Sequence, residues 1–154
     1  MGKMNGEPTV RVGSVLAIPA VLRSLGADPA EVFAAAKVDP TLFDDAENVM
    51  PYAARSRLIS ACVEKTGCRH FGLLLGQQGG LYSLGLVGYL AQHSPDVGTA
   101  LRNLVRYLHI HVRGATPTLK VSGDLVHLGY EILQSRIEAV DQIQDGALAL
   151  ECNI

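Results

Sequence analysis

The spacing of the apolar residues changes twice along this chain, and the change limits the folds open to it. Up to about residue 112 the apolar residues recur at helical intervals. Across residues 117–132 apolar and polar residues alternate instead, on both sides of Ser122-Gly123-Asp124, and helical intervals return from Val140 onward. Two alternating runs around a Gly-Asp turn predict a β-hairpin. A hairpin alone is marginally stable in water, so it must pack on helices or further strands. The sequence therefore predicts an α+β fold, with a helical N-terminal two thirds packed against a small, mainly antiparallel sheet.

Proline, aspartate and glycine mark the ends of the predicted helices. Asp28-Pro29 and Asp39-Pro40 each combine a capping carboxylate with a proline suited to the first helical position, and Gly67 ends a helix that Pro51 opens. A polar connector is predicted at residues 44–50. The predicted helices cover residues 19–25, 29–37, 41–44, 51–66, 71–78, 84–93, 97–112 and 140–154.

The two ends of the chain differ in character. Residues 1–13 are expected to form a flexible tail, and residues 14–154 a single regulatory domain. The apolar stripe of the last helix still runs at Ile154, with no glycine, proline or basic turn to close it. We therefore expect this final helix to be truncated and the natural chain to continue.

Charge and composition argue against several classes of protein. The chain of 154 residues carries a net charge of −2, and its basic residues are dispersed. A nucleic-acid-binding module would carry a basic surplus, so direct DNA binding by these residues is disfavoured. No apolar run approaches the roughly 20 residues of a membrane span, and no secretion signal opens the chain. We expect a cytoplasmic protein with reduced thiols and no membrane partner.

Two polar faces follow if residues 97–112 form one helix. Arg102, Arg106, His109 and Arg113 would align as an anion-binding stripe for a carboxylate or phosphate effector, or simply as a solvated face, which is the commoner arrangement. The neighbouring face, which would either line a pocket or border the core, carries Asn103, Tyr107 and His111. The candidate effector-binding residues are Asn103, Arg106, Tyr107, His111 and Arg113.

Other reactive groups give weaker indications. Cys68 lies beside Arg69 and His70, a setting that suits either a redox-sensing thiol or an ordinary loop cysteine, the latter being commoner. His109 and His111 would point about 200° apart on a helix, so they cannot share one metal ion. We expect no metal, no cofactor and no catalytic residues, because no nucleophile, acid–base pair or phosphate loop stands in a suitable context.

Three segments together resemble a known family. They are GADPAEVFAAAKVDPTLFDD, PYAARSRLISACVEKTGCRHFGLLLG and SLGLVGYLAQHSPDVGTALRNLVRYL. They contain the two Asp-Pro pairs, the pattern Thr-Gly-x-x-x-Phe-Gly-Leu, and Leu-Gly-x-x-Gly-Tyr followed by Ser-Pro and Ala-Leu-Arg-x-Leu-x-Arg-Tyr. In order and spacing they resemble the N-terminal arabinose-binding-like domain of AraC/XylS-type transcription regulators, over about residues 20–150.

The resemblance implies a cytoplasmic domain that binds a small-molecule effector and controls an attached DNA-binding domain with two helix-turn-helix units. That second domain is absent from this chain, so the resemblance assigns no DNA contact to any residue. Cys68 stands where the family usually has an acidic residue. The family's effectors are diverse, so no effector class is inherited.

An effector would shift the domain between two states, and its pocket should lie between elements that can move, such as the long helix and the hairpin. The alternative is a dimerisation module, a homodimer without a small ligand.

Overall fold

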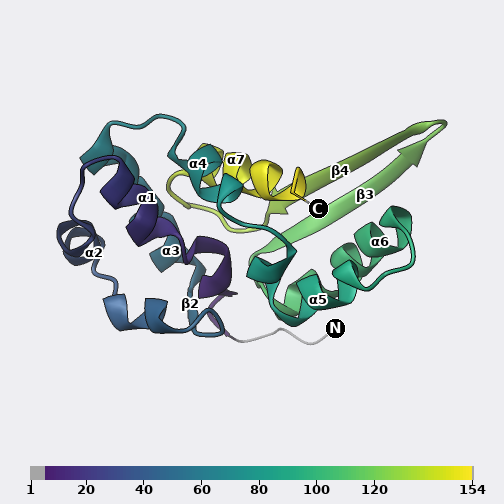
Figure 1. Cartoon of the computed structure of the whole chain (residues 1–154), viewed down its shortest axis with the longest axis horizontal. Coiled ribbons are helices and arrows are strands. Elements are labelled where there is room, and N and C mark those ends of the chain that lie inside the picture. The colour runs from purple at the N-terminus through teal and green to yellow at the C-terminus, as the bar shows by residue number, and fades with distance from the viewer. Residues whose placement is uncertain (1–5, 154) are drawn as a thin grey trace.

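The structure is a computed structural model that describes residues 6–153 (Figure 1). Its helical part begins with α1 (Ile18–Ser24), α2 (Pro29–Ala36), α3 (Tyr52–Thr66) and α4 (Phe71–Gln77), with short 3-10 turns η1 (Val12–Val15) and η2 (Pro40–Asp44). The predicted caps form, because the Asp28 carboxylate accepts a hydrogen bond from the Ala30 N–H at 2.9 Å. Gly67 ends α3 with a positive φ of 67°, which glycine adopts without strain.

A small sheet occupies part of the segment predicted to be a flexible tail. Strand β1 (Thr9–Arg11) pairs antiparallel with β2 (Val49–Pro51), and Val10 and Val12 are buried. The prediction of a flexible tail is therefore wrong from Thr9 onward, while residues 1–5 lie outside the described part of the chain. The polar connector predicted at residues 44–50 likewise ends in a strand. Strands of three residues are too short to show alternation, which is why the sequence pattern missed them.

The next unit is a pair of helices, α5 (Leu86–Gln92) and α6 (Val97–Tyr107), preceded by η3 (Leu81–Leu84). Asp96 caps α6 by accepting from the Thr99 N–H at 2.8 Å. The α-helix stops at Tyr107 and continues as the single turn η4 (Leu108–Ile110), so the prediction of one helix over residues 97–112 is wrong in its last five residues. The chain leaves the helix to pair with β1, because the Arg11 N–H donates to the His111 carbonyl and the Arg113 N–H donates to the Thr9 carbonyl.

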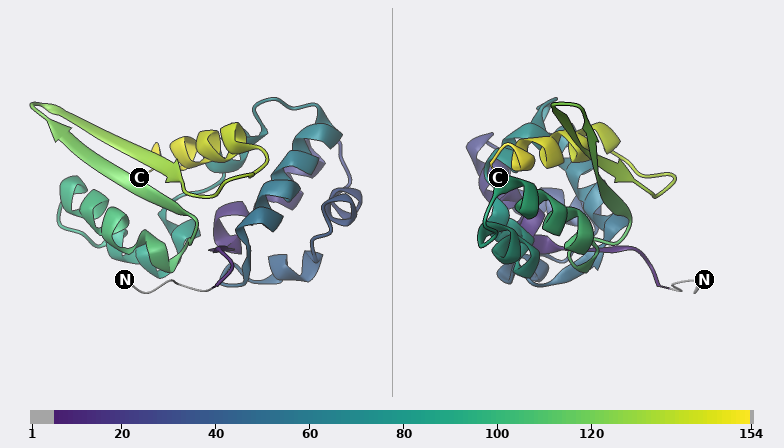
Figure 2. Two further views of the ribbon diagram at one scale, coloured as in Figure 1. Left: turned by 180° about the vertical axis from the view of Figure 1, so that it is seen from behind. Right: turned by 90° about the vertical axis from the view of Figure 1, so that its right-hand side faces the viewer.

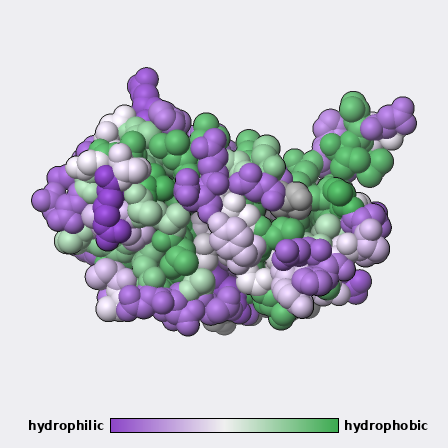
Figure 3. All heavy atoms as spheres, in the orientation of Figure 1, coloured by the Kyte–Doolittle hydropathy of each residue, from purple (hydrophilic) through white to green (hydrophobic). Residues whose placement is uncertain are grey.

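The predicted hairpin is confirmed. Strands β3 (Ala115–Ser122) and β4 (Leu125–Ile132) pair antiparallel in a register that sets Pro117 opposite Tyr130. The turn between them contains Gly123 at a φ of 58°. The hairpin projects beyond the helices, and the space-filling view shows apolar atoms near its end (Figures 2 and 3).

The last helix, α7 (Val140–Glu151), lies against α4 at a distance that only glycine allows. A Cβ atom on Gly72 would lie 2.0 Å from the Gln142 carbonyl oxygen, and one on Gly76 would lie 2.3 Å from that of Gly146. One core joins all these elements, and its fully buried side chains include Ile18, Leu22, Met50, Tyr52, Leu58 and Phe71. The α+β class is as predicted, with a largely helical first two thirds, but the strands form two small antiparallel sheets, β1–β2 and β3–β4, rather than one.

Candidate functional site

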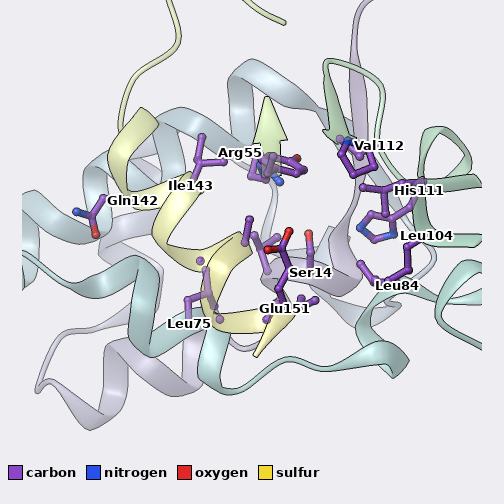
Figure 4. Close-up of a pocket in the computed structure, with 18 of the residues that line it drawn as sticks. Ser14, Arg55, Leu75, Leu84, Leu104, His111, Val112, Gln142, Ile143 and Glu151 are labelled. Carbon is purple, nitrogen blue, oxygen red and sulfur yellow. The ribbon is translucent and has the colours of Figure 1, made fainter. Parts of the chain in front are cut away.

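A cavity opens in the middle of the molecule, between the helices and one face of the hairpin (Figure 4). Its empty space is about 830 Å³, a volume that includes open solvent at the mouth. The walls are mainly apolar and come from η1, α3, α4, η3, α6, η4 and the turn after it, β3, β4 and α7. They include Val15, Ile59, Leu75, Leu84, Leu104, Leu108, Val112, Pro117, Leu128, Ile143 and Leu150. The cavity thus lies between α6 and the hairpin, where a pocket was expected, and reaches further to α3 and α7.

Arg55 is the most unusual residue of this cavity. It lies on the buried face of α3 and its side chain is 5% exposed, yet its Nε and Nη2 atoms have no hydrogen-bond partner. The guanidinium rests on the ring of Tyr52, one helical turn earlier, at 4.2 Å from the ring centroid. Stacking of this kind stabilises a cation but leaves its N–H groups free. A buried charge without a partner is costly, so the arrangement suits a group that receives a ligand.

His111, in the turn after η4, also lines the cavity and is likewise 5% exposed. Neither ring nitrogen has a hydrogen-bond partner. Burial, with a smaller contribution from the positive charges of Arg55 and Arg11, lowers the pKa of His111 to about 4. The imidazole is therefore neutral near pH 7 and can donate one hydrogen bond and accept another.

Other polar groups complete the setting. The Tyr52 hydroxyl is buried near Arg55 and Tyr130 without a well-formed hydrogen bond, and burial raises the pKa of this phenol. Glu151 of α7 also lines the cavity, and partial burial raises the pKa of its carboxyl. Gln142 is already engaged, because its amide accepts from the Gly72 N–H and donates to the Arg69 carbonyl, each at 2.9 Å. Gln142 is therefore part of the wall, whereas Arg55 and His111 have free hydrogen-bonding capacity.

These features define what the cavity can do chemically. Apolar walls favour burial of a small hydrophobic body, and a few placed polar groups orient it, as in most small-molecule sites. Figure 4 shows Arg55, His111 and Glu151 reaching the cavity from three separate segments of the chain. A bound molecule would therefore touch α3, the turn after η4 and α7 at the same time.

The structure separates the predicted candidate residues. Of the five, His111 alone lines the cavity. Asn103 donates to the Ser94 hydroxyl at 3.0 Å, Arg106 is exposed with its guanidinium 5.3 Å from the centre of the Tyr107 ring, and Tyr107 packs on the edge of the core. Arg113 is exposed and lies beyond the end of α6. The single-helix geometry that would align Arg102, Arg106, His109 and Arg113 is not formed, because the helix ends at Tyr107.

Sequence reasoning missed Arg55, although the pattern held a signal. Arg55 precedes Leu58, Ile59 and Cys62 at intervals of three, four and seven residues, so it is in phase with the apolar stripe of its helix. A charged residue in phase with a buried stripe is the unusual observation that merits a functional explanation.

The cysteines differ in their environments. Cys62 is buried in the core, and burial raises the pKa of its thiol to about 12. Cys68 is half-buried, and its backbone N–H donates to the Thr66 hydroxyl. Within residues 6–153, no three His, Cys, Asp or Glu side chains gather as metal ligands would.

No helix among the described residues combines the length and apolar character that a membrane span requires.

Known proteins similar to this chain are transcription regulators. Residues 26–152 match the family model described as the N-terminal arabinose-binding domain of AraC transcription regulators. The chain is 29% identical over 119 residues to the HTH-type transcriptional regulator VirS of Mycobacterium tuberculosis strain CDC 1551 / Oshkosh. The same values hold for VirS of strain ATCC 25618 / H37Rv. The match covers 76% of this chain and 35% of each relative, so the chain spans about a third of the length of these curated relatives.

Proposed function

The chain belongs to the family of N-terminal arabinose-binding domains of AraC transcription regulators, and from this premise we propose that it is an effector-sensing domain whose ligand occupies the central cavity. The observation that carries the proposal is the unpaired, buried Arg55 in a cavity with apolar walls. A ligand that binds there is enclosed by elements from both ends of the chain. The domain is a cytoplasmic regulatory module without enzymatic activity.

The cavity supplies a route for regulation. It is lined by the hairpin, by α7 and by the turn after η4, and these segments would move relative to α3 if the space were filled or emptied. A ligand shifts a two-state equilibrium only by its difference in affinity between the states. In a full-length regulator, the shift would change how this domain contacts its partner copy or an attached DNA-binding domain.

A thermal-shift screen tests the proposal. Amino acids, sugars, aromatic acids, fatty acids and cyclic dinucleotides are added singly to the purified chain, and the unfolding midpoint is followed as a function of concentration. A ligand specific for the folded state at about one hundred times its Kd stabilises by about 2.7 kcal/mol, which is readily measured as a shift in the midpoint. A rise that one compound class produces in the wild type, and that Leu104→Trp reduces by filling the cavity, supports the proposal. The absence of a rise with any class contradicts it.

A dimerisation module is the second candidate, favoured by the apolar side chains exposed on α5 and η3. Tyr82, Leu86 and Tyr89 are each more than half exposed. Multi-angle light scattering separates the two functions. A stable dimer that Leu86→Lys dissociates, in a chain that no compound of the screen stabilises, would support dimerisation alone.

A further inference from the structure

We propose that the effector is a monocarboxylate with an apolar body, and that its carboxylate is held by Arg55; this inference rests on the proposed sensing function. Two nitrogens of Arg55, Nε and Nη2, are fully buried and have no hydrogen-bond partner. These two nitrogens form one edge of the guanidinium plane, with N–H bonds that point in parallel. Such an edge matches the two oxygens of one carboxylate, which can accept both hydrogen bonds at once.

Tyr52 fixes the direction of this edge. Its ring is fully buried and covers one face of the guanidinium, at 4.2 Å from the centroid to the central carbon. Its backbone N–H is anchored to the Pro8 carbonyl at 2.8 Å, which ties the start of α3 to the N-terminal segment. Tyr52 therefore holds the plane of the guanidinium in one orientation. Because Nε and Nη2 are almost fully covered, neighbouring side chains must move aside when a carboxylate binds.

The charges around the cavity favour one negative charge on the ligand. Among the cavity-lining residues of the described chain, Arg55 is the only permanent cation. His111 is neutral near pH 7, so it contributes hydrogen bonds rather than charge. A phosphate dianion would leave a second charge uncompensated, and the Glu151 carboxyl at the cavity would add to the repulsion. Glu151 repels a carboxylate as well, but less strongly than a dianion, so a singly charged ligand is the better match for Arg55.

The remaining walls specify the rest of the ligand. Leu84, Leu104 and Leu108 line the helical side, and Leu128 lines the hairpin side. These side chains offer no hydrogen bonds, so they favour an alkyl or aryl body over a sugar or an amino acid, whose polar groups would lose their hydration without replacement. His111 is free to hydrogen-bond the carboxylate or one further polar group of the ligand.

Calorimetric titration of the purified chain tests the inference with octanoate, 1-octanol and octyl phosphate at about pH 7.5. Phenylacetate and 2-phenylethanol form a second pair that differs in the same way. We expect at least one acid to bind about tenfold or more tightly than its alcohol, because a charge-assisted hydrogen-bond pair is worth at least that factor. Arg55→Met should remove this preference and leave alcohol binding unchanged. Arg57→Met, an exposed position on the same helix, should leave both unchanged.

The folding of the variant is checked in the same samples. Arg55→Met replaces an unpaired buried charge by an apolar chain, so its unfolding midpoint should equal or exceed that of the wild type. Arg55→Lys keeps the charge but lacks the parallel N–H edge, and it should bind the acid several-fold more weakly.

Four results would overturn the inference. Equal affinities for acid and alcohol would show that the carboxylate contributes nothing to binding. A neutral compound that stabilises the protein in the effector screen, when no acid binds, would show the same. Either result would leave the sensing function standing. Tighter binding of octyl phosphate than of octanoate would assign the site to phosphates. An acid preference that survives in Arg55→Met would place the carboxylate elsewhere.

Discussion

Acidification should destabilise this protein through His111, and the size of the effect follows from its burial. In the unfolded chain the imidazole takes up a proton near pH 6.5, whereas in the folded protein burial keeps it neutral down to about pH 4. Between these values the unfolded state binds one more proton than the folded state, so the free energy of unfolding falls as the pH falls. Above about pH 6.5 both states are neutral and this contribution is fully present; below about pH 4 both are protonated and no further loss occurs.

The loss can be estimated from the two pKa values. A fall in the pKa from 6.5 to about 4 corresponds to roughly 3 kcal/mol, at about 1.4 kcal/mol for each pH unit between them. This is a large part of the stability of a domain that unfolds with about 5–15 kcal/mol. His111 has no hydrogen-bond partner that could stabilise its protonated form within the described residues, and the Arg55 charge opposes protonation.

The assay is urea unfolding followed by circular dichroism, at steps from about pH 7 to about pH 4, for the wild type and His111→Gln. Carboxyl groups titrate in both proteins, so the difference between them isolates His111. We expect the wild type to lose roughly 3 kcal/mol relative to His111→Gln over this range. His127→Gln, at an exposed position on β4, should follow the wild type. Parallel curves for wild type and His111→Gln would refute the reasoning, because they would mean that His111 takes up its proton equally well in the folded state.

Two further predictions concern packing and helix capping. Gly72→Ala should destabilise the protein by about 1–3 kcal/mol in the same urea assay, since its Cβ would meet the Gln142 carbonyl oxygen at 2.0 Å. Gly98→Ala, where the nearest atoms belong to flexible side chains, should be neutral or stabilising. Equal effects of the two substitutions would contradict the close contact of α4 and α7. Asp96→Ala removes the acceptor for the Thr99 N–H and should cost about 1 kcal/mol, and Asp96→Asn should retain most of the capping, so a similar loss in both variants would argue against the cap.

The sequence predicted the fold well where its signals were local. The cap at Asp28, the helix end at Gly67 and the hairpin around Gly123 each depend on a few neighbouring residues, and each is present in the structure. The sheet of β1 and β2 was not predictable in this way, since its strands lie about forty residues apart and are three residues long. The early end of α6 has the same cause, because the pairing of His111 and Arg113 with β1 is a long-range contact.

The candidate site likewise combines residues that local sequence signals indicate with residues that only long-range contacts bring together. His111 was named from the sequence, but as part of a helical face that the structure does not form. Arg55 was not named, because its proposed function depends on a cavity that α7 and the hairpin help to line, far away in the sequence. Its position in the apolar stripe of α3 was the one local sign. A polar residue in phase with a buried stripe can therefore indicate a ligand site better than a row of charges on an exposed face.

The measurement that tests the central claim most directly is a two-dimensional ¹H–¹⁵N correlation spectrum of the purified chain, recorded with and without a compound that raises its unfolding midpoint. The account predicts concentration-dependent shifts at the amides of Arg55, His111, Ile143 and Leu128, which surround the cavity from four segments, and little change at Ala30 and Glu31 on α2. Shifts confined to α5 and η3, with the cavity amides unchanged, would contradict the account, because they would place binding on the exposed apolar face and leave the cavity without a ligand.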